Sequence, residues 1–98
     1  MTKQEFITKV KADLAVFTPT LDYGNQMSTR VKEDAKSQYQ TKLADLKTQK
    51  EKLESFLREA ESTADDKWEG VSSRLESGLY DSSRRATEDV EELKKVYV

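Results

Sequence analysis

Residues 43–80 read LADLKTQKEKLESFLREAESTADDKWEGVSSRLESGLY, and this stretch decides the fold of the chain. Its apolar residues recur at alternating three- and four-residue steps, and the pattern continues to residue 93 without a proline. The stripe consists of Leu43, Leu46, Leu53, Leu57, Ala60, Ala64, Trp68, Val71, Leu75, Leu79, Ala86, Val90 and Leu93. Because this spacing gathers apolar side chains on one helix face, it predicts helices that pack through a narrow seam.

The chain is short and highly charged. It has 98 residues, enough for one domain, and its charged fraction of 37% exceeds its hydrophobic fraction of 35%. This balance is typical of coiled coils and long exposed helices rather than of thick globular cores. We therefore predict a single helical domain over residues 1–98, with a thin apolar core.

Positive and negative side chains are interspersed along the chain, and the net charge is −2. Residues 25–61 hold eight basic and seven acidic side chains, a net charge of +1, whereas residues 62–98 hold six and nine, a net charge of −3. No segment is strongly basic, which argues against nucleic acid as a partner. The two segments would attract each other weakly if they lay side by side.

The inventory of reactive side chains is small. The chain has no cysteine and no histidine, so the commonest nucleophiles and general bases are missing. It also lacks a glycine-rich phosphate loop and a serine in a strand–turn–helix elbow. We therefore predict that the protein is not an enzyme, has no catalytic residues, and binds neither a cofactor nor a metal.

No segment has the features of a targeting or membrane-spanning sequence. The N-terminal residues lack the apolar core of a signal peptide, and no run approaches the roughly 18 apolar residues that cross a bilayer. The absence of cysteine suits a reducing compartment. We expect a soluble, cytoplasmic protein.

Residues 3–17 are predicted to form a short amphipathic helix. Its apolar side chains lie three and four positions apart, and residue 21 continues the register. This candidate interaction face consists of Phe6, Ile7, Val10, Leu14, Phe17 and Leu21. Pro19 lacks the N–H that the helical ladder needs, and Gly24 follows shortly, so we predict a break or kink over residues 18–25.

Two long helices are predicted after this break, over residues 26–61 and 64–96. Ser62 and Thr63 each precede an aspartate by three residues, a pattern that starts helices. If the chain turns there, residues whose numbers sum to about 125 meet across an αα-hairpin, so that Leu46 faces Leu79. The hairpin seam then consists of Tyr39, Leu46, Leu53, Leu57, Trp68, Val71, Leu75, Leu79, Val90 and Leu93. The rival is one uninterrupted helix, because the seam keeps its phase across the turn.

The fold we expect is all-α, an elongated antiparallel helical hairpin of the coiled-coil type with a shorter N-terminal helix. The candidate interaction face has no partner within the hairpin. Residues 1–24 either fold back to complete a three-helix bundle or pack against the same segment of another chain. Since a hairpin with a single seam is thin, we expect self-association into a homo-oligomer.

Two acidic clusters and one basic pair are the remaining candidates for ligand binding. The clusters are Asp65, Asp66 and Glu69, and Glu88, Asp89, Glu91 and Glu92. Neither has the spacing of a calcium-binding loop, and the chain has no histidine to join them. We interpret both clusters as solvated helix faces, and the pair Arg84-Arg85 as surface charge.

The tripeptide Trp68-Glu69-Gly70 resembles the W-x-G motif of the WXG100 proteins of bacterial type VII secretion, which are helical hairpins of about this length. In those proteins the tripeptide lies in the turn near mid-chain, and a Tyr-x-x-x-acid signal follows the second helix. Here the motif lies two-thirds of the way along the chain, and Tyr80 is followed by Arg84. A seam tryptophan followed by an incidental glycine is the interpretation we favour.

A second resemblance covers nearly the whole chain. The stretches KQEFITKVKADL, RVKEDAKSQYQTKLADLKTQKEKLE and DDKWEGVSSRLESG are similar to small bacterial "coiled coil domain-containing" proteins, which are uncharacterised and all-helical. The steps Tyr39-x-x-x-Leu43 and Asp65-x-x-Trp68 match the pattern of those proteins. Pro19 departs from it, because helix runs through that region in the family. The resemblance implies an interaction or scaffold role with a suspected link to stress.

These observations together predict a non-enzymatic helical interaction or scaffold protein that self-associates through its seams. A second helical protein is the other partner we consider. The first alternative is binding at a membrane surface, because the candidate interaction face is the most hydrophobic helix face in the chain. The second alternative is a secreted helical-hairpin substrate, which the W-x-G motif suggests.

Overall fold

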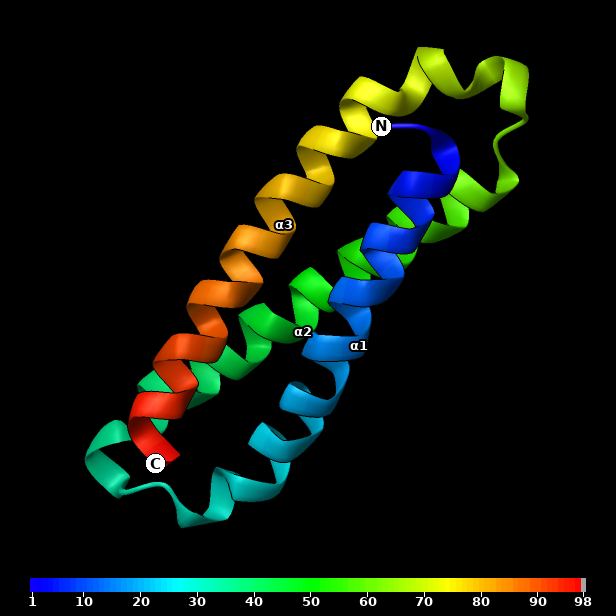
Figure 1. The fold of residues 1–98 in the computed structure, drawn as a ribbon. Coiled ribbons are helices and arrows are strands. Elements are labelled where there is room, and N and C mark those ends of the chain that lie inside the picture. The colour runs from blue at the N-terminus through cyan, green and yellow to red at the C-terminus, as the bar shows by residue number, and fades with distance from the viewer. Residues whose placement is uncertain (98) are drawn as a thin grey trace.

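The computed structural model describes the backbone of residues 1–97 and the side chains of residues 1–96. Three long α-helices dominate it: α1 spans Lys3–Met27, α2 spans Glu33–Ser62 and α3 spans Trp68–Tyr97 (Figure 1). Two short 3₁₀ helices connect them, η1 at Ser28–Arg30 and η2 at Asp65–Lys67. The predicted all-α fold with an antiparallel hairpin is confirmed, and the chain turns back rather than continuing as one helix.

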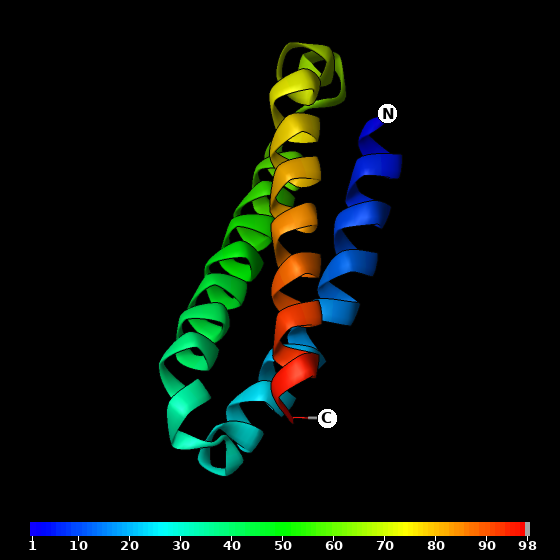
Figure 2. The ribbon, with the colours of Figure 1, turned by 90° about the vertical axis from the view of Figure 1, so that its left-hand side faces the viewer.

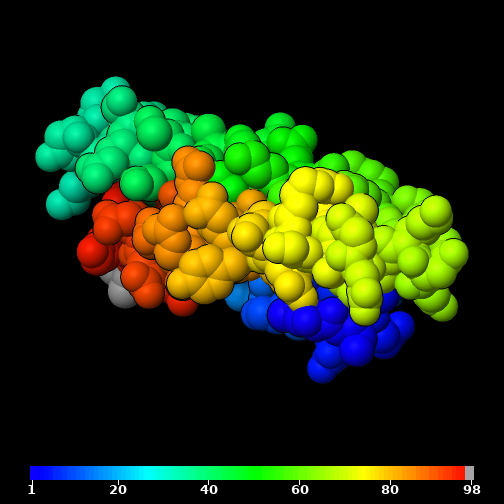
Figure 3. All heavy atoms as spheres, turned by 90° about the horizontal axis from the view of Figure 1, so that it is seen from above, coloured from blue at the N-terminus to red at the C-terminus, as the bar shows by residue number. Residues whose placement is uncertain are grey.

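The three helices lie side by side in an elongated bundle of 53 × 18 × 16 Å (Figures 1 and 2). The helix α2 contacts both of the others along much of its length, whereas α1 and α3 meet less extensively. Figure 3 shows α2 and α3 side by side on one face, with only the N-terminal part of α1 visible beside α3. Residues 1–24 therefore fold back onto the hairpin of their own chain and complete a three-helix bundle.

The core is one continuous cluster that runs the length of the bundle. Its buried apolar residues are Phe6, Ile7, Val10, Phe17, Leu21, Val31, Tyr39, Leu43, Leu46, Leu53, Ala60, Trp68, Leu75, Leu79, Ala86, Val90 and Leu93. Leu14, Leu57 and Val71 are partly buried against it. Apart from Ala64, which is exposed in the turn between α2 and α3, the predicted stripe and the N-terminal face lie in or against this core. Burial of apolar surface therefore holds all three helices together.

Of the predicted break or kink at residues 18–25, the break is wrong, and the kink stays a prediction. The helix α1 continues through Pro19 to Met27, ten residues beyond the predicted end at residue 17. Pro19 is exposed, whereas Phe17 and Leu21 on either side of it are buried in the core. Because the proline lies on the wet face, the helix loses one hydrogen bond there but keeps its packing on both sides. The connection to α2 lies instead at residues 28–32.

Gly24 marks a close crossing of α1 and α2 rather than the end of a helix. A Cβ atom added there would lie 2.7 Å from Leu43 Cδ2, so no larger residue fits without movement. The Tyr39 hydroxyl donates a hydrogen bond of 2.5 Å to the Gly24 carbonyl oxygen. Because glycine has no side chain, Leu43 and Tyr39 of α2 pack directly against the backbone of α1 in its last turn.

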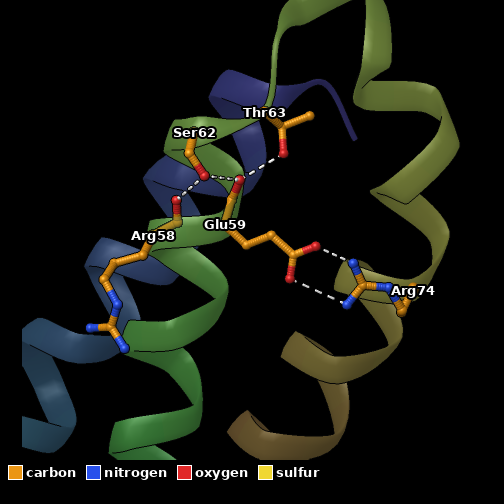
Figure 4. Close-up of polar contacts among 5 residues, drawn as sticks. All are labelled: Arg58, Glu59, Ser62, Thr63 and Arg74. Carbon is orange, nitrogen blue, oxygen red and sulfur yellow. Dashed lines mark hydrogen bonds and ion pairs between the residues drawn. The ribbon is translucent and has the colours of Figure 1, made fainter.

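Ser62 and Thr63 end α2 instead of starting α3, contrary to the prediction. The Ser62 hydroxyl donates to the Arg58 carbonyl oxygen at 2.9 Å, and the Thr63 hydroxyl donates to that of Glu59 at 2.6 Å (Figure 4). These bonds satisfy carbonyl groups that have no partner at the end of a helix. The helix α3 begins later than predicted, at Trp68, after the 3₁₀ turn η2.

This longer turn shifts the register of the hairpin. Glu59 forms an ion pair with Arg74, whereas the predicted register placed it opposite Asp66 (Figure 4). Further along, Asp45 pairs with Arg85, and Phe56 packs against Gly78. These contacts lie five to nine residues further along α3 than predicted, so Leu46 does not face Leu79 directly. A shift of this size keeps the apolar stripes face to face, because the seam repeats every seven residues.

Candidate interaction site

The predicted interaction face lies inside the bundle. Phe6, Ile7, Val10, Phe17 and Leu21 are buried against the other two helices, and Leu14 is partly buried. Phe6 and Val10 have no exposed surface. This face is therefore not available to a membrane or to another chain in the folded protein, and its role is to hold α1 on the hairpin.

Trp68 anchors the start of α3 to the N-terminus of α1. Its ring centroid lies 5.4 Å from that of Phe6, with an angle of 55° between the planes, a favourable tilted geometry. Its indole N–H donates to the Met1 carbonyl oxygen at 3.1 Å. The W-x-G tripeptide thus follows the hairpin turn directly, and Gly70, with no atom within 4 Å of an added Cβ, faces open space. The tryptophan has a packing role, as we favoured.

A groove runs between α1 and α3, where the two helices meet least. Its volume is about 480 Å³. We call it the α1–α3 groove. It is lined by Met1, Lys9, Asp13, Phe17, Glu76, Leu79, Tyr80, Ser83, Arg84, Thr87, Glu88 and Glu91. None of these positions except Phe17 and Leu79 belongs to the face or seam predicted from the sequence.

The groove combines an apolar floor with a polar rim. Phe17 and Leu79 form the floor and are 5% and 3% exposed, whereas the Tyr80 ring beside them is 73% exposed. Asp13 joins the two walls, because it accepts from Lys9 on its own helix at 2.7 Å and from the Ser83 hydroxyl on α3 at 2.5 Å. An exposed aromatic ring beside a recessed apolar floor is typical of surfaces that bind proteins.

Acidic side chains outnumber basic ones in this groove. Four carboxyl groups line it against three cations, namely Lys9, Arg84 and the N-terminal ammonium of Met1. Lys9 is paired with Asp13, Arg84 with Asp81 and Glu88, and the ammonium with Glu76. The groove therefore carries a small negative excess, one carboxylate more than its cations.

A second polar cluster lies in the seam between α2 and α3. Asp89 is 3% exposed, and its carboxyl group lies within hydrogen-bonding reach of that of Asp45. Asp45 also accepts hydrogen bonds of 3.2 Å from Gln49 and from Arg85. Burial, and then the neighbouring Asp45, raises the pKa of Asp89 to about 7, while the hydrogen bond with Asp89 lowers the pKa of Asp45.

The acidic clusters and the arginine pair do not form a shared site. Within residues 1–97, no three carboxyl groups come together in a way that could hold a metal ion. Arg84 and Arg85 contact different partners, since Arg85 reaches across to Asp45 on α2. They do not converge on a common ligand.

The sequence contains signals for both the α2–α3 polar cluster and the α1–α3 groove that the apolar periodicity does not reveal. Gln49 and Asp89 are polar residues at seam positions, three residues from Leu46 and Ala86 respectively, and both are buried. A polar residue on an apolar stripe is the mark of a buried polar contact. Tyr80 shows the opposite pattern, because it is a large aromatic residue that lies off the apolar stripe, directly after the seam residue Leu79.

The fold defines the class of this protein as a small all-α three-helix bundle. Within its described residues, no helix combines the length and the apolar character that a bilayer span requires. No family model, no curated protein and no solved structure matches the chain. The resemblances to bacterial coiled-coil domain-containing proteins and to W-x-G hairpin proteins stay predictions.

Proposed function

We propose that this protein is a non-enzymatic interaction protein that binds an amphipathic helix of a partner protein in its α1–α3 groove. The observation that carries the proposal is the exposed Tyr80 ring beside the recessed floor of Phe17 and Leu79. A helix laid in that groove would bury the exposed ring and convert three helices into four, a stable way to complete a bundle.

The partner helix is expected to carry basic residues beside its apolar stripe. Four carboxyl groups against three cations, of which one is the N-terminal ammonium, leave a small negative excess that matches lysine and arginine better than acids. Rim charges of this kind set orientation and association rate more than affinity, which the aromatic anchor supplies.

The described residues of α2 do not present such a helix on the surface. The outward face of α2 is formed by Gln40, Ala44, Lys47, Glu51, Ser55 and Arg58, which contain no large apolar side chain. The large exposed apolar residues of the described chain are Met1, Val16, Tyr23 and Tyr80, all outside α2. The seam residues pack within the chain, which supports a partner helix in the groove over the predicted self-association through the seams. A homo-oligomer is an alternative outcome of the test, and the cytoplasmic location stays a prediction.

The test uses two synthetic helical peptides with the same leucine stripe, one flanked by lysine and one by glutamate. We expect the lysine peptide to shift backbone amide signals of Phe17, Leu79, Tyr80 and Ser83 in a nitrogen-15 NMR titration of the full chain. The glutamate peptide should bind more weakly. Shifts on the outward face of α2, or equal binding of both peptides, would contradict the proposal.

Matched variants separate groove binding from general charge attraction. Tyr80→Lys removes the aromatic anchor and adds a repulsive charge, so it should weaken binding of the lysine peptide about tenfold or more. Gln40→Lys adds the same charge on the exposed face of α2 and should leave binding nearly unchanged. Equal losses in both variants would point to charge alone. Sedimentation equilibrium of the free protein is the remaining control. If the protein alone forms a dimer and Tyr80→Lys dissociates it, the occupant of the groove is a second copy of this chain rather than a partner helix.

A further inference from the structure

The carboxyl pair of Asp45 and Asp89 lies in the α2–α3 seam, apart from the proposed binding groove. Asp89 is 3% exposed, and Asp45 keeps 28% of its side chain exposed. Arg85, one turn before Asp89 on α3, reaches Asp45 Oδ1 at 3.2 Å, which places Asp89 beside Asp45 in the seam, and a hydrogen bond between the two carboxyl groups acts on the pKa of both. Two ionised carboxylates cannot form a hydrogen bond, because neither has a proton to donate. Their proximity in the seam therefore calls for one proton between them.

The hydrogen bonds around Asp45 and Asp89 also indicate that the two carboxyl groups share one proton. Gln49 and Arg85 both donate to Asp45 Oδ1, each at 3.2 Å. Asp89 Oδ2 and Gln49 Oε1 are buried and have no hydrogen-bond partner among the described residues. The cluster thus holds more acceptors than donors, and a proton on Asp89 supplies a donor where a buried carboxylate would be costly.

We propose that Asp45 and Asp89 share one proton and act as a pH-sensitive contact between α2 and α3, stable when Asp89 is protonated and weakened when it ionises. The charged groups that act on Asp89 are Asp45 and Lys42 from α2 and Arg85 from its own helix. None comes from α1 within the described chain. Lys42 and Arg85 favour the ionised form of Asp89, but burial and Asp45 outweigh them.

The direction of the pH effect follows from proton binding. Burial raises the pKa of Asp89 to about 7 in the bundle, whereas an aspartate in an unfolded chain titrates near about 4. Between these two values the folded chain holds a proton that the unfolded chain has released. The stabilisation is therefore complete below about pH 4 and is lost as the pH rises through about 7.

The composition of the chain leaves few other groups that titrate in the same pH range as Asp89. There is no histidine, so no other side chain ordinarily titrates between about pH 5 and 8. The hydrogen bond with Glu76 raises the pKa of the N-terminal amine above its usual value of 8.0, out of the window. The pKa of Asp45 is lowered by Asp89, which places its own titration on the acid side.

The first test is urea denaturation of the full chain, followed by far-ultraviolet circular dichroism. For one proton with these pKa values, the unfolding equilibrium constant should rise about 20-fold between about pH 5.5 and about pH 7.5. Asp89→Asn keeps the size of the side chain and a hydrogen-bond donor without a titrating group, so its unfolding constant should stay nearly flat over that range. Asp81→Asn, an exposed position on the same helix, should keep the full pH dependence. A flat wild-type profile, or one that becomes more stable with rising pH, would overturn the proposal.

A second measurement uses only the wild-type chain, so its result does not depend on whether a variant folds. Carbon-13 NMR of the side-chain carboxyl groups of the wild-type chain reports the titration of each aspartate directly. Asp89 should titrate near neutral pH, and the Asp45 signal should respond in the same step because the two groups are coupled. A midpoint for Asp89 at the ordinary value of an exposed aspartate would show that no proton is shared, and would overturn the proposal whatever the urea data give.

Discussion

Replacement of Gly24 by alanine tests whether α1 and α2 cross as closely as the structure shows. A Cβ atom at this position would lie 2.7 Å from Leu43 Cδ2, whereas carbon atoms in contact normally stay about 3.5–4.0 Å apart. Leu43 is 4% exposed, so its side chain cannot swing into solvent to make room. Overpacking of this kind costs about 1–3 kcal/mol.

Gly70→Ala is the matched control for this change. Both glycines lie in a terminal turn of a helix, where alanine gains at most the roughly 0.5–1 kcal/mol over glycine that applies in a helix interior. No atom lies within 4 Å of an added Cβ at Gly70, so that variant should be as stable as the wild type or somewhat more stable. The difference in the free energy of unfolding between the two variants cancels the preference of helices for alanine over glycine. What is left is the cost of overpacking at Gly24, about 1–3 kcal/mol.

Urea denaturation of the two variants beside the wild type measures this difference. The expected order of stability is Gly70→Ala, then wild type, then Gly24→Ala. A double-mutant cycle with Leu43→Val assigns the cost to the contact, since the shorter side chain should recover part of the loss. If Gly24→Ala proves as stable as Gly70→Ala, the two helices do not approach closely at Gly24, and the packing of α1 described above is wrong.

Three further predictions test other parts of the fold. Pro19→Ala restores the missing helical hydrogen bond on the exposed face and should raise the free energy of unfolding by up to about 3 kcal/mol, whereas a true break at that point would make the change nearly neutral. Trp68→Ala should lower the free energy of unfolding by about 3–5 kcal/mol because the ring is buried against Phe6, and Trp68→Phe should cost much less; equal small losses would mean an unpacked ring. Cysteines at Asp45 and Arg85 should be joined by a short thiol crosslinker faster than cysteines at Asp45 and Tyr80, and the reverse order would restore the register predicted from the sequence.

The periodic apolar stripe was sufficient to predict three helices and their buried faces. Residues such as Leu46, Leu53 and Leu75 are buried as their spacing required, because one helix face can meet another only through its apolar side. Local helix breakers were less informative. Pro19 and Gly24 predicted a break, but packing of Phe17 and Leu21 outweighs one lost hydrogen bond, and Gly24 serves a close crossing.

The register of the hairpin could not be read from the stripe for a geometric reason. A seam that repeats every seven residues stays matched when one helix slides by one repeat, so Leu46 opposite Leu79 looks as good as the arrangement found. The polar pairs break this ambiguity. Glu59 with Arg74 and Asp45 with Arg85 define one register, but they involve side chains off the apolar pattern. The α1–α3 groove was equally hidden, because it depends on how far two helices diverge rather than on either helix alone.

The position of Phe6 against Trp68 tests the central claim, that the N-terminal helix folds back onto its own chain. The ring centroids are 5.4 Å apart, and the chain has a single tryptophan, so its indole signals are unambiguous. We predict nuclear Overhauser effects between the Trp68 indole and the Phe6 ring, measured within one chain by mixing isotope-labelled and unlabelled protein. Sharp Trp68 signals without these effects, or effects seen only between labelled and unlabelled chains, would contradict the three-helix bundle.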